Sequence, residues 1–348
     1  MAQDRDGDPG AFDGAGFLQV RQPLHPITTN TPHGQAAAAY VEYISDNLYD
    51  RFPFTLREKY TAVWIVEELL AMGYDWNDIY VQEFTAEDVG LPLEMAIIAD
   101  IMVFIDHSPF ANLNKRQSLQ SQNVILTVPG LSEEVIVVGA HYDSVFFPGA
   151  SDNASGVALL LESAKRLINT DNYYTVEYVF FGAEELGLYG AYYYVQNLSP
   201  SEHGNILFII NADILLDGDD LLYMAGYNAD GHSGANHITD IWDKIAQSVN
   251  AHHGLNLTAL PEGVFGPSDQ LAFLPYGHTA MLLAGLVTDD YIPGGDFTIA
   301  IMGMNRVLHS PRDEVHFIIE NWPGKIETNM RAFSIFLEEI IHANYYFD

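Results

Sequence analysis

Short apolar runs alternate with amphipathic stretches through most of the chain. The apolar runs are rich in β-branched and aromatic side chains, which is typical of buried strands, and they cover 78–84, 123–130, 133–143, 174–185, 204–215 and 278–285. Apolar positions at helical spacing predict helices at 34–49, 57–73, 157–167, 237–250 and 325–346. Strands that alternate with helices indicate an α/β fold: a single globular domain whose central, mostly parallel mixed sheet is flanked by helices on both faces.

The chain divides into a short leader and one domain. The start, "MAQDRDGDPGAFDGAGF", lacks the apolar segment of a signal peptide, so we expect a flexible leader over 1–30. The domain would then span 31–348, with the N-terminal helices of 31–75 packed on the sheet. A secreted protein whose signal peptide has been removed can begin in this way, and so can a cytoplasmic protein. We expect a secreted or extracytoplasmic protein and leave the cytoplasmic alternative open.

The composition argues against several classes of protein. Asp and Glu number 47 against 14 Lys and Arg, for a formal net charge of −33, so we expect no nucleic-acid partner. The absence of cysteine excludes disulfides, a thiolate nucleophile and Cys-ligated zinc. The longest apolar run, Met95–Ile105, is shorter than the roughly 20 residues of a membrane span and contains Asp100. We expect no membrane span, and a buried element or a lining of the binding site at this run.

Side chains that can bind metals stand where predicted strands end. His141, Glu184–Glu185 and Asp213 each follow the last residues of an apolar run. In sheets of this kind ligands bind beyond the carboxyl ends of the strands, so we expect these side chains to belong to one site. The acidic run "DGDD" at 217–220 is interpreted differently, as a solvated hairpin tip.

Imidazoles and carboxylates without thiolates suit a pair of zinc ions, for which cobalt or manganese could substitute. Two adjacent divalent ions need a bridging carboxylate and one or two further ligands each. They also need a nearby carboxylate that binds no metal and can move a proton, and Glu184 is the candidate for this base. The candidate ligands are His141, Asp152, Glu185, Asp213 and His309.

Five motifs follow one another along the chain: "AHYDS", "GASDNASG", "FFGAEELGLYGA", "NADIL" and "HSPRDE". In type and order they resemble the motifs of the co-catalytic di-zinc aminopeptidases, peptidase family 28 of the metallopeptidases. The resemblance covers roughly residues 115–345. It implies a zinc-exopeptidase-like fold and a zinc-dependent aminopeptidase that hydrolyses N-terminal residues from peptides with a free N-terminus.

The same resemblance implies how two zinc ions would be held. Asp152 would bridge both ions. His141 and Asp213 would complete the coordination of one ion, and Glu185 and His309 that of the other. A cis peptide bond is expected after Asp152.

The resemblance also implies roles for residues that bind no metal. Glu184 would take a proton from the bridging water and deliver it to the leaving amine. Asp143 would accept a hydrogen bond from the second ring nitrogen of His141 and orient that ligand. The chain departs from the family pattern at Leu308, where some members have an oxyanion-stabilising tyrosine, and at Gln270, where a histidine is frequent.

Other interpretations of these residues stay open. Taken singly, His141 could be a hydrogen-bonded core histidine and Asp152 a helix cap. Three other functions fit the same fold: a glutaminyl-cyclase-like acyltransferase, which usually works with one zinc, a carboxypeptidase of the same group, and a binding module without catalysis. The number of bound zinc ions would distinguish a glutaminyl-cyclase-like acyltransferase from an aminopeptidase. The sequence determines neither the side-chain preference nor the oligomeric state.

Overall fold

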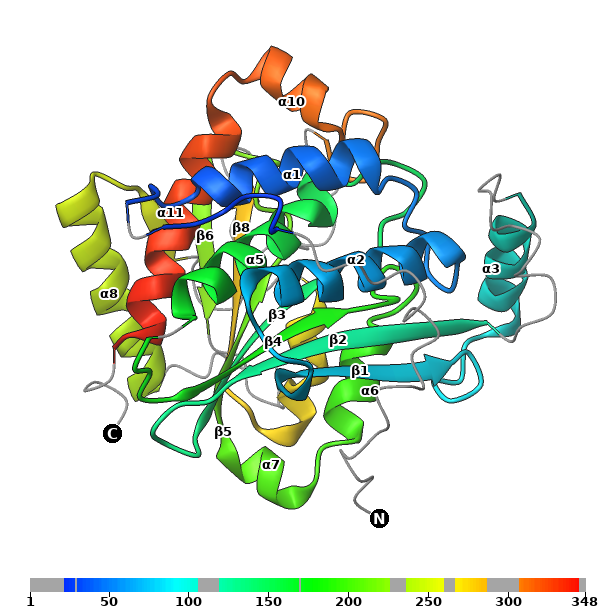
Figure 1. The fold of residues 1–348 in the computed structure, drawn as a ribbon, viewed down its shortest axis with the longest axis horizontal. Helices are drawn as coiled ribbons and strands as arrows, with labels where there is room; N and C mark the ends of the chain where they lie inside the picture. Colours follow the sequence, from blue (N-terminus) through cyan, green and yellow to red (C-terminus); the bar gives the residue numbers. More distant parts are fainter. Residues whose placement is uncertain are drawn as a thin grey trace, which may run out of the picture.

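A single mixed sheet organises the chain in the computed structural model, which describes residues 22–28, 30–105, 119–168, 170–225, 236–259, 267–286 and 307–343. Within these ranges eight strands pair in the order β1-β2-β4-β3-β5-β8-β6-β7 (Figure 1). They are β1 (Ile79–Thr85), β2 (Gln120–Val128), β3 (Val135–His141), β4 (Thr175–Phe181), β5 (Ile206–Ala212), β6 (Asp220–Ala225), β7 (Leu257–Ala259) and β8 (Ala280–Leu286).

The four central strands, β4, β3, β5 and β8, run parallel to one another. On one side of this group β2 and β1 continue the sheet in antiparallel pairings, and on the other side β6 pairs antiparallel with β8. The predicted fold class is therefore confirmed. Because the four central strands share one direction, their carboxyl ends meet at the same edge of the sheet.

Helices cover both faces of the sheet. The longer ones in the described ranges are α1 (Gln35–Asn47), α2 (Leu56–Met72), α3 (Leu93–Ile105), α5 (Ser155–Leu167), α8 (His237–His253) and α11 (Lys325–Ile341). The shorter ones are α6 (Tyr189–Gln196), α7 (Pro200–Asn205), α10 (Val315–Asn321), η2 (Trp76–Asp78), η3 (Ala150–Ala154), η4 (Asp269–Ala272) and η5 (Leu274–Tyr276). Figure 1 shows α1, α2 and α5 in front of the sheet.

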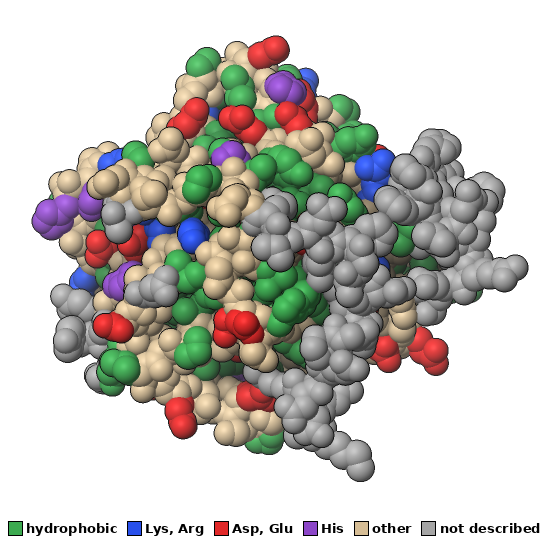
Figure 2. Space-filling view, in the orientation of Figure 1, with side chains coloured by type: hydrophobic (Ala, Val, Ile, Leu, Met, Phe, Trp, Pro, Cys, Tyr) green, Lys and Arg blue, Asp and Glu red, His purple; other side chains and the backbone are tan. Residues whose placement is uncertain are grey.

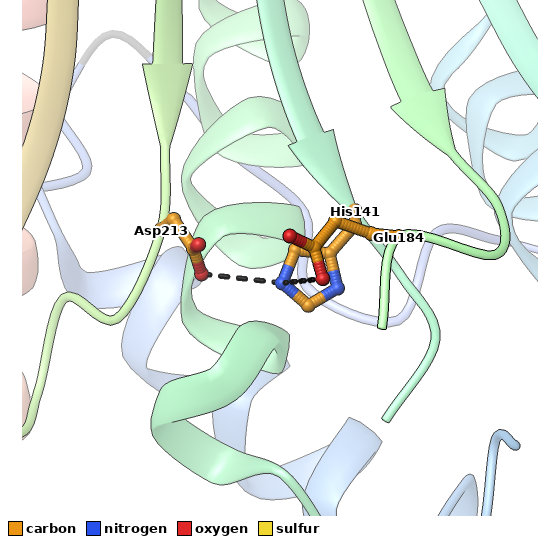
Figure 3. A group of neighbouring side chains, drawn as sticks. All are labelled: His141, Glu184 and Asp213. Atoms are coloured by element: carbon orange, nitrogen blue, oxygen red, sulfur yellow. Dashed lines mark hydrogen bonds and ion pairs between the residues drawn. The ribbon is translucent and has the colours of Figure 1, made fainter. Parts of the chain in front are cut away.

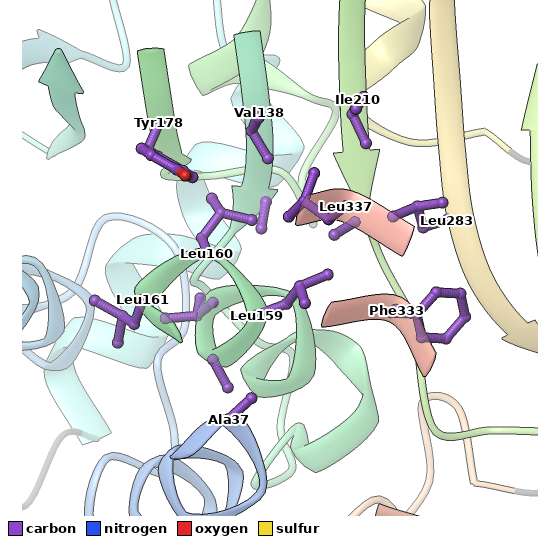
Figure 4. Close-up of a cluster of buried hydrophobic side chains, with 14 of the residues drawn as sticks. Ala37, Val138, Leu159, Leu160, Leu161, Tyr178, Ile210, Leu283, Phe333 and Leu337 are labelled. Atoms are coloured by element: carbon purple, nitrogen blue, oxygen red, sulfur yellow. The ribbon is translucent and has the colours of Figure 1, made fainter. Parts of the chain in front are cut away.

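Alternating side chains of the strands supply two cores. Val138 of β3 and Ile210 of β5 point to the larger core, which they share with α1, α5 and α11 (Figure 4). Val137 and Ile209, one residue earlier in each strand, point to the smaller core on the other face, with α6 and η4. Strands buried on both faces read as continuous apolar runs, which is the pattern that the sequence shows.

Local signals set the bounds of α2, close to the predicted 57–73. The side chain of Thr55 accepts a hydrogen bond from the backbone N–H of Glu58, which caps the first turn. Gly73 ends the helix with a φ of 111°, a backbone conformation that favours glycine. Several buried side chains of α2 join the larger core, so this helix packs on the sheet.

The apolar run around residue 100 differs from its prediction. It forms α3, but Leu93 is 74%, Ile97 50% and Ile101 52% exposed, and of the described side chains in this helix Ala99 alone is buried. The expectation of a buried element is therefore wrong for most of the side chains of this helix that the structure describes, and a lining of the binding site stays a prediction. An apolar helix is buried only where another segment packs against it. The hydrophobic pattern of the helix does not show whether such a segment exists. None of the helices in the described ranges has both the length and the apolarity that a membrane crossing requires.

The acidic run at 217–220 was also predicted incorrectly. β6 begins at Asp220 and pairs with β8 rather than with β5, so no hairpin joins β5 to β6. Asp217 is fully buried instead of solvated. Its carboxylate accepts hydrogen bonds from the backbone N–H groups of Val307 and Leu308, and these satisfy the buried charge. The predicted leader, 1–30, lies mostly outside the described residues.

Candidate metal centre

Three neighbouring strand ends bring the predicted site residues together. His141 is the last residue of β3, Asp213 follows β5, and Glu184 and Glu185 follow β4 within a tight turn. Figure 3 shows His141, Glu184 and Asp213 converging at this edge of the sheet. These loops meet because β4, β3 and β5 are adjacent and parallel.

The first group of side chains surrounds His141. Its Nε2 atom lies 3.0 Å from Oδ1 of Asp152 and 3.2 Å from Oδ1 of Asp213. Oε2 of Glu184 is more distant, at 4.0 Å from the same nitrogen. The imidazole is 1% exposed, so this group lies inside the protein.

The second group surrounds His309. Its Nε2 atom lies 3.1 Å from Oδ2 of Asp152 and 3.0 Å from Oε2 of Glu185. The His309 side chain is 55% exposed, which places the second group nearer to solvent than the first. Asp152 takes part in both groups, with one carboxylate oxygen toward each histidine.

The turn that carries Asp152 is irregular. Asp152 and Asn153 have non-helical backbone angles within η3, and the peptide bond between them is cis, which confirms that expectation. Asn153 anchors the turn from inside, since its amide donates to the carbonyl oxygen of Ala212 and its Oδ1 accepts from the backbone N–H of Gly156. A Cβ at Gly156 would lie 2.3 Å from the Ala212 oxygen, so the helix can begin this close to β5 only with glycine there.

The carboxylates and imidazoles shift one another's pKa values. Burial raises the pKa of Glu184 well above its ordinary value and that of Glu185 to about 7, so both groups resist ionisation unless a cation is near. Hydrogen bonds to Asp152 and Glu185 raise the pKa of His309 to about 11. Burial lowers the pKa of His141, but the charge of Glu184 and other carboxylates outweighs burial and raises it well above the ordinary value. Both groups therefore favour bound positive charge.

The donor atoms fit a divalent zinc ion at each group. Two sets, His141 with Glu184 and Asp213, and Asp152 with Glu185 and His309, each offer ligand atoms within 4.8 Å of one another. Imidazole nitrogen and carboxylate oxygen are ligands that zinc accepts. Oε1 of Glu185 is buried and has no hydrogen-bond partner among the described residues, which leaves it available to a cation.

Asp143 faces the second ring nitrogen of His141 and also contacts the turn that follows β4. Its Oδ1 lies 3.5 Å from Nδ1 of His141, which is long for a hydrogen bond. Its closer contacts are to the backbone, where its two oxygens accept from the N–H groups of Glu184 at 3.1 Å and Glu185 at 3.0 Å. Asp143 therefore holds the turn that carries both glutamates.

Three residues that support the site were given no role in the sequence analysis. Asp313 accepts from the backbone N–H groups of Ser151 and Asp152, and Ser268 donates to Oδ2 of Asp213 at 2.7 Å. Asp217 fixes the two residues before His309. These contacts join segments from 55 to 162 positions apart in the sequence, so no local pattern could have indicated them.

The departure at Gln270 has a structural counterpart. Oε1 of Gln270 accepts a hydrogen bond from the amide of Asn211 at 2.8 Å, and the same amide donates to Ser268 at 2.9 Å. Gln270 therefore helps to hold the serine that contacts Asp213. Beside it, burial raises the pKa of Asp269 well above its ordinary value.

Comparison with known proteins identifies the family. The model of peptidase family M28 matches residues 123–334. Aminopeptidase Y of Saccharomyces cerevisiae is 30% identical over 198 residues, which are 56% of this chain and 36% of that protein. Aminopeptidase YwaD of Bacillus subtilis is 47% identical over 70 residues, 20% of this chain and 15% of that protein. The chain thus spans well under two thirds of these relatives.

Solved structures share the fold at low sequence identity. The zinc aminopeptidase BSAP from Bacillus subtilis has a TM-score of 0.62 at 18% identity, with 90% of this chain and 96% of that chain covered. A glutaminyl cyclase of Bacteroides thetaiotaomicron has a TM-score of 0.60 at 17% identity, with 90% and 99% covered. The family match extends over more than half of the chain and includes all of the predicted ligands and Glu184, and on that basis the chain belongs to peptidase family M28.

Proposed function

We propose that the chain is a two-zinc aminopeptidase. The observation that carries the proposal is the position of Asp152, whose two carboxylate oxygens lie 3.0 and 3.1 Å from two different histidines. A carboxylate in that position can serve two ions at once. Asp152 with His141 and Asp213 would hold one zinc ion, and Asp152 with Glu185 and His309 would hold the other.

Glu184 is the proposed general base. Its Oε2 is 4.0 Å from Nε2 of His141, farther than the oxygens of Asp152 and Asp213 at 3.0 and 3.2 Å, so Glu184 is the carboxylate of this group to which we assign proton transfer. When bound, a pair of zinc ions would lower the pKa of the attacking water molecule and polarise the substrate's carbonyl group. Glu184 would take the proton from the attacking water and deliver it to the leaving amine. Burial raises the pKa of this carboxyl group, which favours its protonated form after the first transfer.

Peptides with a free N-terminus are the proposed substrates. The crowding of carboxylates at the site favours an ammonium group, and the relatives in two organisms are named aminopeptidases. Nucleic acid is not a proposed partner, because the formal charge of −33 repels phosphate backbones. On the face shown in Figure 2, acidic side chains are spread over the described surface.

Export from the cytoplasm is also a proposal. One relative, 43% identical over 102 residues, is the probable lipoprotein aminopeptidase LpqL of Mycobacterium tuberculosis. Fractionation of the source cells with an antibody against this chain tests the proposal. Recovery of the chain from the cytoplasmic fraction alone would contradict it.

A substitution of the base tests the mechanism. Glu184→Gln keeps the size of the side chain but cannot accept the proton, so turnover of an aminoacyl p-nitroanilide should fall by about 10²–10⁴-fold. The variant should still bind two zinc ions per chain, measured by metal analysis after dialysis. Near-normal turnover would remove Glu184 from the role of base, and loss of zinc would make it a ligand.

Substrates with a free or a blocked end distinguish the alternative functions. The wild-type enzyme should cleave substrates with a free amine and spare the same substrates with an acetylated N-terminus. Equal cleavage of both would contradict an aminopeptidase, and cleavage that depends on a free carboxylate would indicate a carboxypeptidase. A glutaminyl cyclase, whose fold this chain shares, would instead cyclise an N-terminal glutamine. From the sequence analysis we expect such an enzyme to bind one zinc ion.

A further inference from the structure

A fully buried arginine lies beside the metal centre. Arg51 is 0% exposed and stands in the connection between α1 and α2, outside the residues that the family model matches. Burying a guanidinium group is unfavourable unless its donors are satisfied. Arg51 meets that condition with four hydrogen bonds to backbone carbonyl oxygens.

Three of these hydrogen bonds go to the loop between two proposed zinc ligands. Nε donates to the oxygen of Tyr142 at 2.6 Å, Nη1 to that of Pro148 at 2.7 Å and Nη2 to that of Gly149 at 3.2 Å. Tyr142 directly follows His141, and Gly149 precedes Asp152 by three positions. One side chain thus holds both ends of the loop.

The loop is built closely around the guanidinium group. Gly149 has a φ of 60°, and a Cβ atom there would lie 2.9 Å from Nη2 of Arg51. The backbone adds a further link, since the N–H of Ser144 donates to the carbonyl oxygen of Arg51 at 3.2 Å. The planar fork of arginine can serve several carbonyl groups at once, which the ammonium group of lysine cannot reproduce.

Arg51 also carries positive charge among carboxylates. Burial lowers its pKa to about 10, while the charges of Asp143, Asp313 and Asp152 oppose that shift. The side chain therefore stays charged at neutral pH. By Coulomb's law alone, a fixed cation beside the site repels a metal ion, so its charge and its geometry have opposite effects on zinc affinity.

We propose that Arg51 is a positioning residue for the metal centre. It fixes the loop that separates His141 from Asp152. The gain in zinc affinity from this positioning is larger than the loss caused by repulsion between its charge and the metal. The inference rests on the proposed two-zinc site.

Three variants test the proposal: Arg51→Met, Arg51→Lys and the control Arg166→Met. Arg166 also donates to a backbone oxygen, that of Thr31, and to Glu162, but it lies near the C-terminal end of α5, whereas Asp152 precedes the N-terminal end of that helix. Zinc affinity is measured by competition with a chelator, thermal stability by circular dichroism, and turnover on the zinc-saturated proteins.

Both Arg51 variants should bind zinc about 10–100-fold more weakly than wild type, the range found for residues that orient metal ligands. The lysine variant keeps the charge and should lose affinity nearly as much as the methionine variant. On zinc-saturated protein, kcat should fall while KM changes little. Arg166→Met should keep the wild-type zinc affinity even where it lowers the melting temperature.

Several results would overturn the inference. Unchanged zinc affinity in both Arg51 variants would leave no positioning role, and tighter binding in Arg51→Met alone would make charge the main effect. Failure of both variants to fold would assign Arg51 to fold stability. A wild-type protein that binds no zinc would instead refute the proposed function, so the two failures are distinguishable.

Discussion

The central sheet carries a pair of histidines near each of its ends. His141 and His309 lie at the carboxyl ends of the parallel strands. His203 of α7 and His278, two residues before β8, lie at the opposite end, where Nδ1 of His203 is 2.9 Å from Nε2 of His278. Their rings are stacked with centroids 5.2 Å apart, and the ring of Tyr276 also stacks on His203, at 4.7 Å.

The two pairs have opposite electrostatic surroundings. Carboxylates within 4.0 Å raise the pKa of His309 to about 11 and that of His141 well above its ordinary value. Burial, and then the neighbouring His203, lower the pKa of His278 to about 4. Both described groups of three or more potential metal ligands lie at the carboxyl end. Among the described residues, carboxylates complete the groups around His141 and His309, and no such group forms around His203 and His278.

The largest expected effect comes from the carboxylate that His141 and His309 share. Asp152→Ala should lose both zinc ions and lower turnover by about 10³-fold or more, because the ions supply several kcal/mol of transition-state stabilisation. Metal analysis and peptide hydrolysis measure both effects. Asp219→Ala, which removes a carboxylate that is 68% exposed, is the control. Retention of both ions by Asp152→Ala would show that the two histidines belong to separate sites.

A smaller effect should follow from removing one histidine of each pair. His309→Ala should reduce the zinc content from two ions to one per chain, because Glu185 and Asp152 keep only carboxylate oxygens for the second ion. His278→Gln should keep two ions and near-normal turnover. Zinc loss in both variants would contradict the distinction between the two ends of the sheet.

The smallest effect concerns how His278, at the amino ends of the parallel strands, changes the stability of the protein at acid pH. Since the folded pKa of His278 is about 4, below the ordinary value of 6.5, the unfolded chain binds the proton more readily. Folding stability from this residue is therefore present above about pH 6.5 and decreases as the pH falls toward 4. His278→Gln should reduce the loss of melting temperature between pH 7.5 and pH 5 by a few degrees. An identical loss in wild type and variant would show that the pair does not titrate in this way.

The sequence predicted the parts of the site that follow from local pattern. Apolar runs located β3, β4 and β5, and the residues just after them include the side chains that the structure brings together. The family motifs supplied Asp152 and His309, which no strand end would have indicated. The roles of these residues as ligands stay a prediction.

The supporting contacts could not be predicted, because each joins distant segments. Arg51 contacts a loop 91–98 positions away, and Asp313 contacts Ser151 across 162 positions. The acidic run at 217–220 looked like a solvated turn because a single sequence does not show that Asp217 meets Val307 and Leu308. The exposure of α3 could not be predicted for the same reason. Whether its apolar side chains are buried depends on distant segments that pack against them, and the sequence of the helix does not show those segments.

The most direct measurement is a crystal structure of the zinc-loaded protein, with anomalous scattering recorded at the zinc edge. Our account predicts two zinc peaks about 3.5–4 Å apart, one beside His141 and Asp213 and the other beside Glu185 and His309. One oxygen of Asp152 should contact each ion. A single peak, or two peaks of which only one contacts Asp152, would contradict the account.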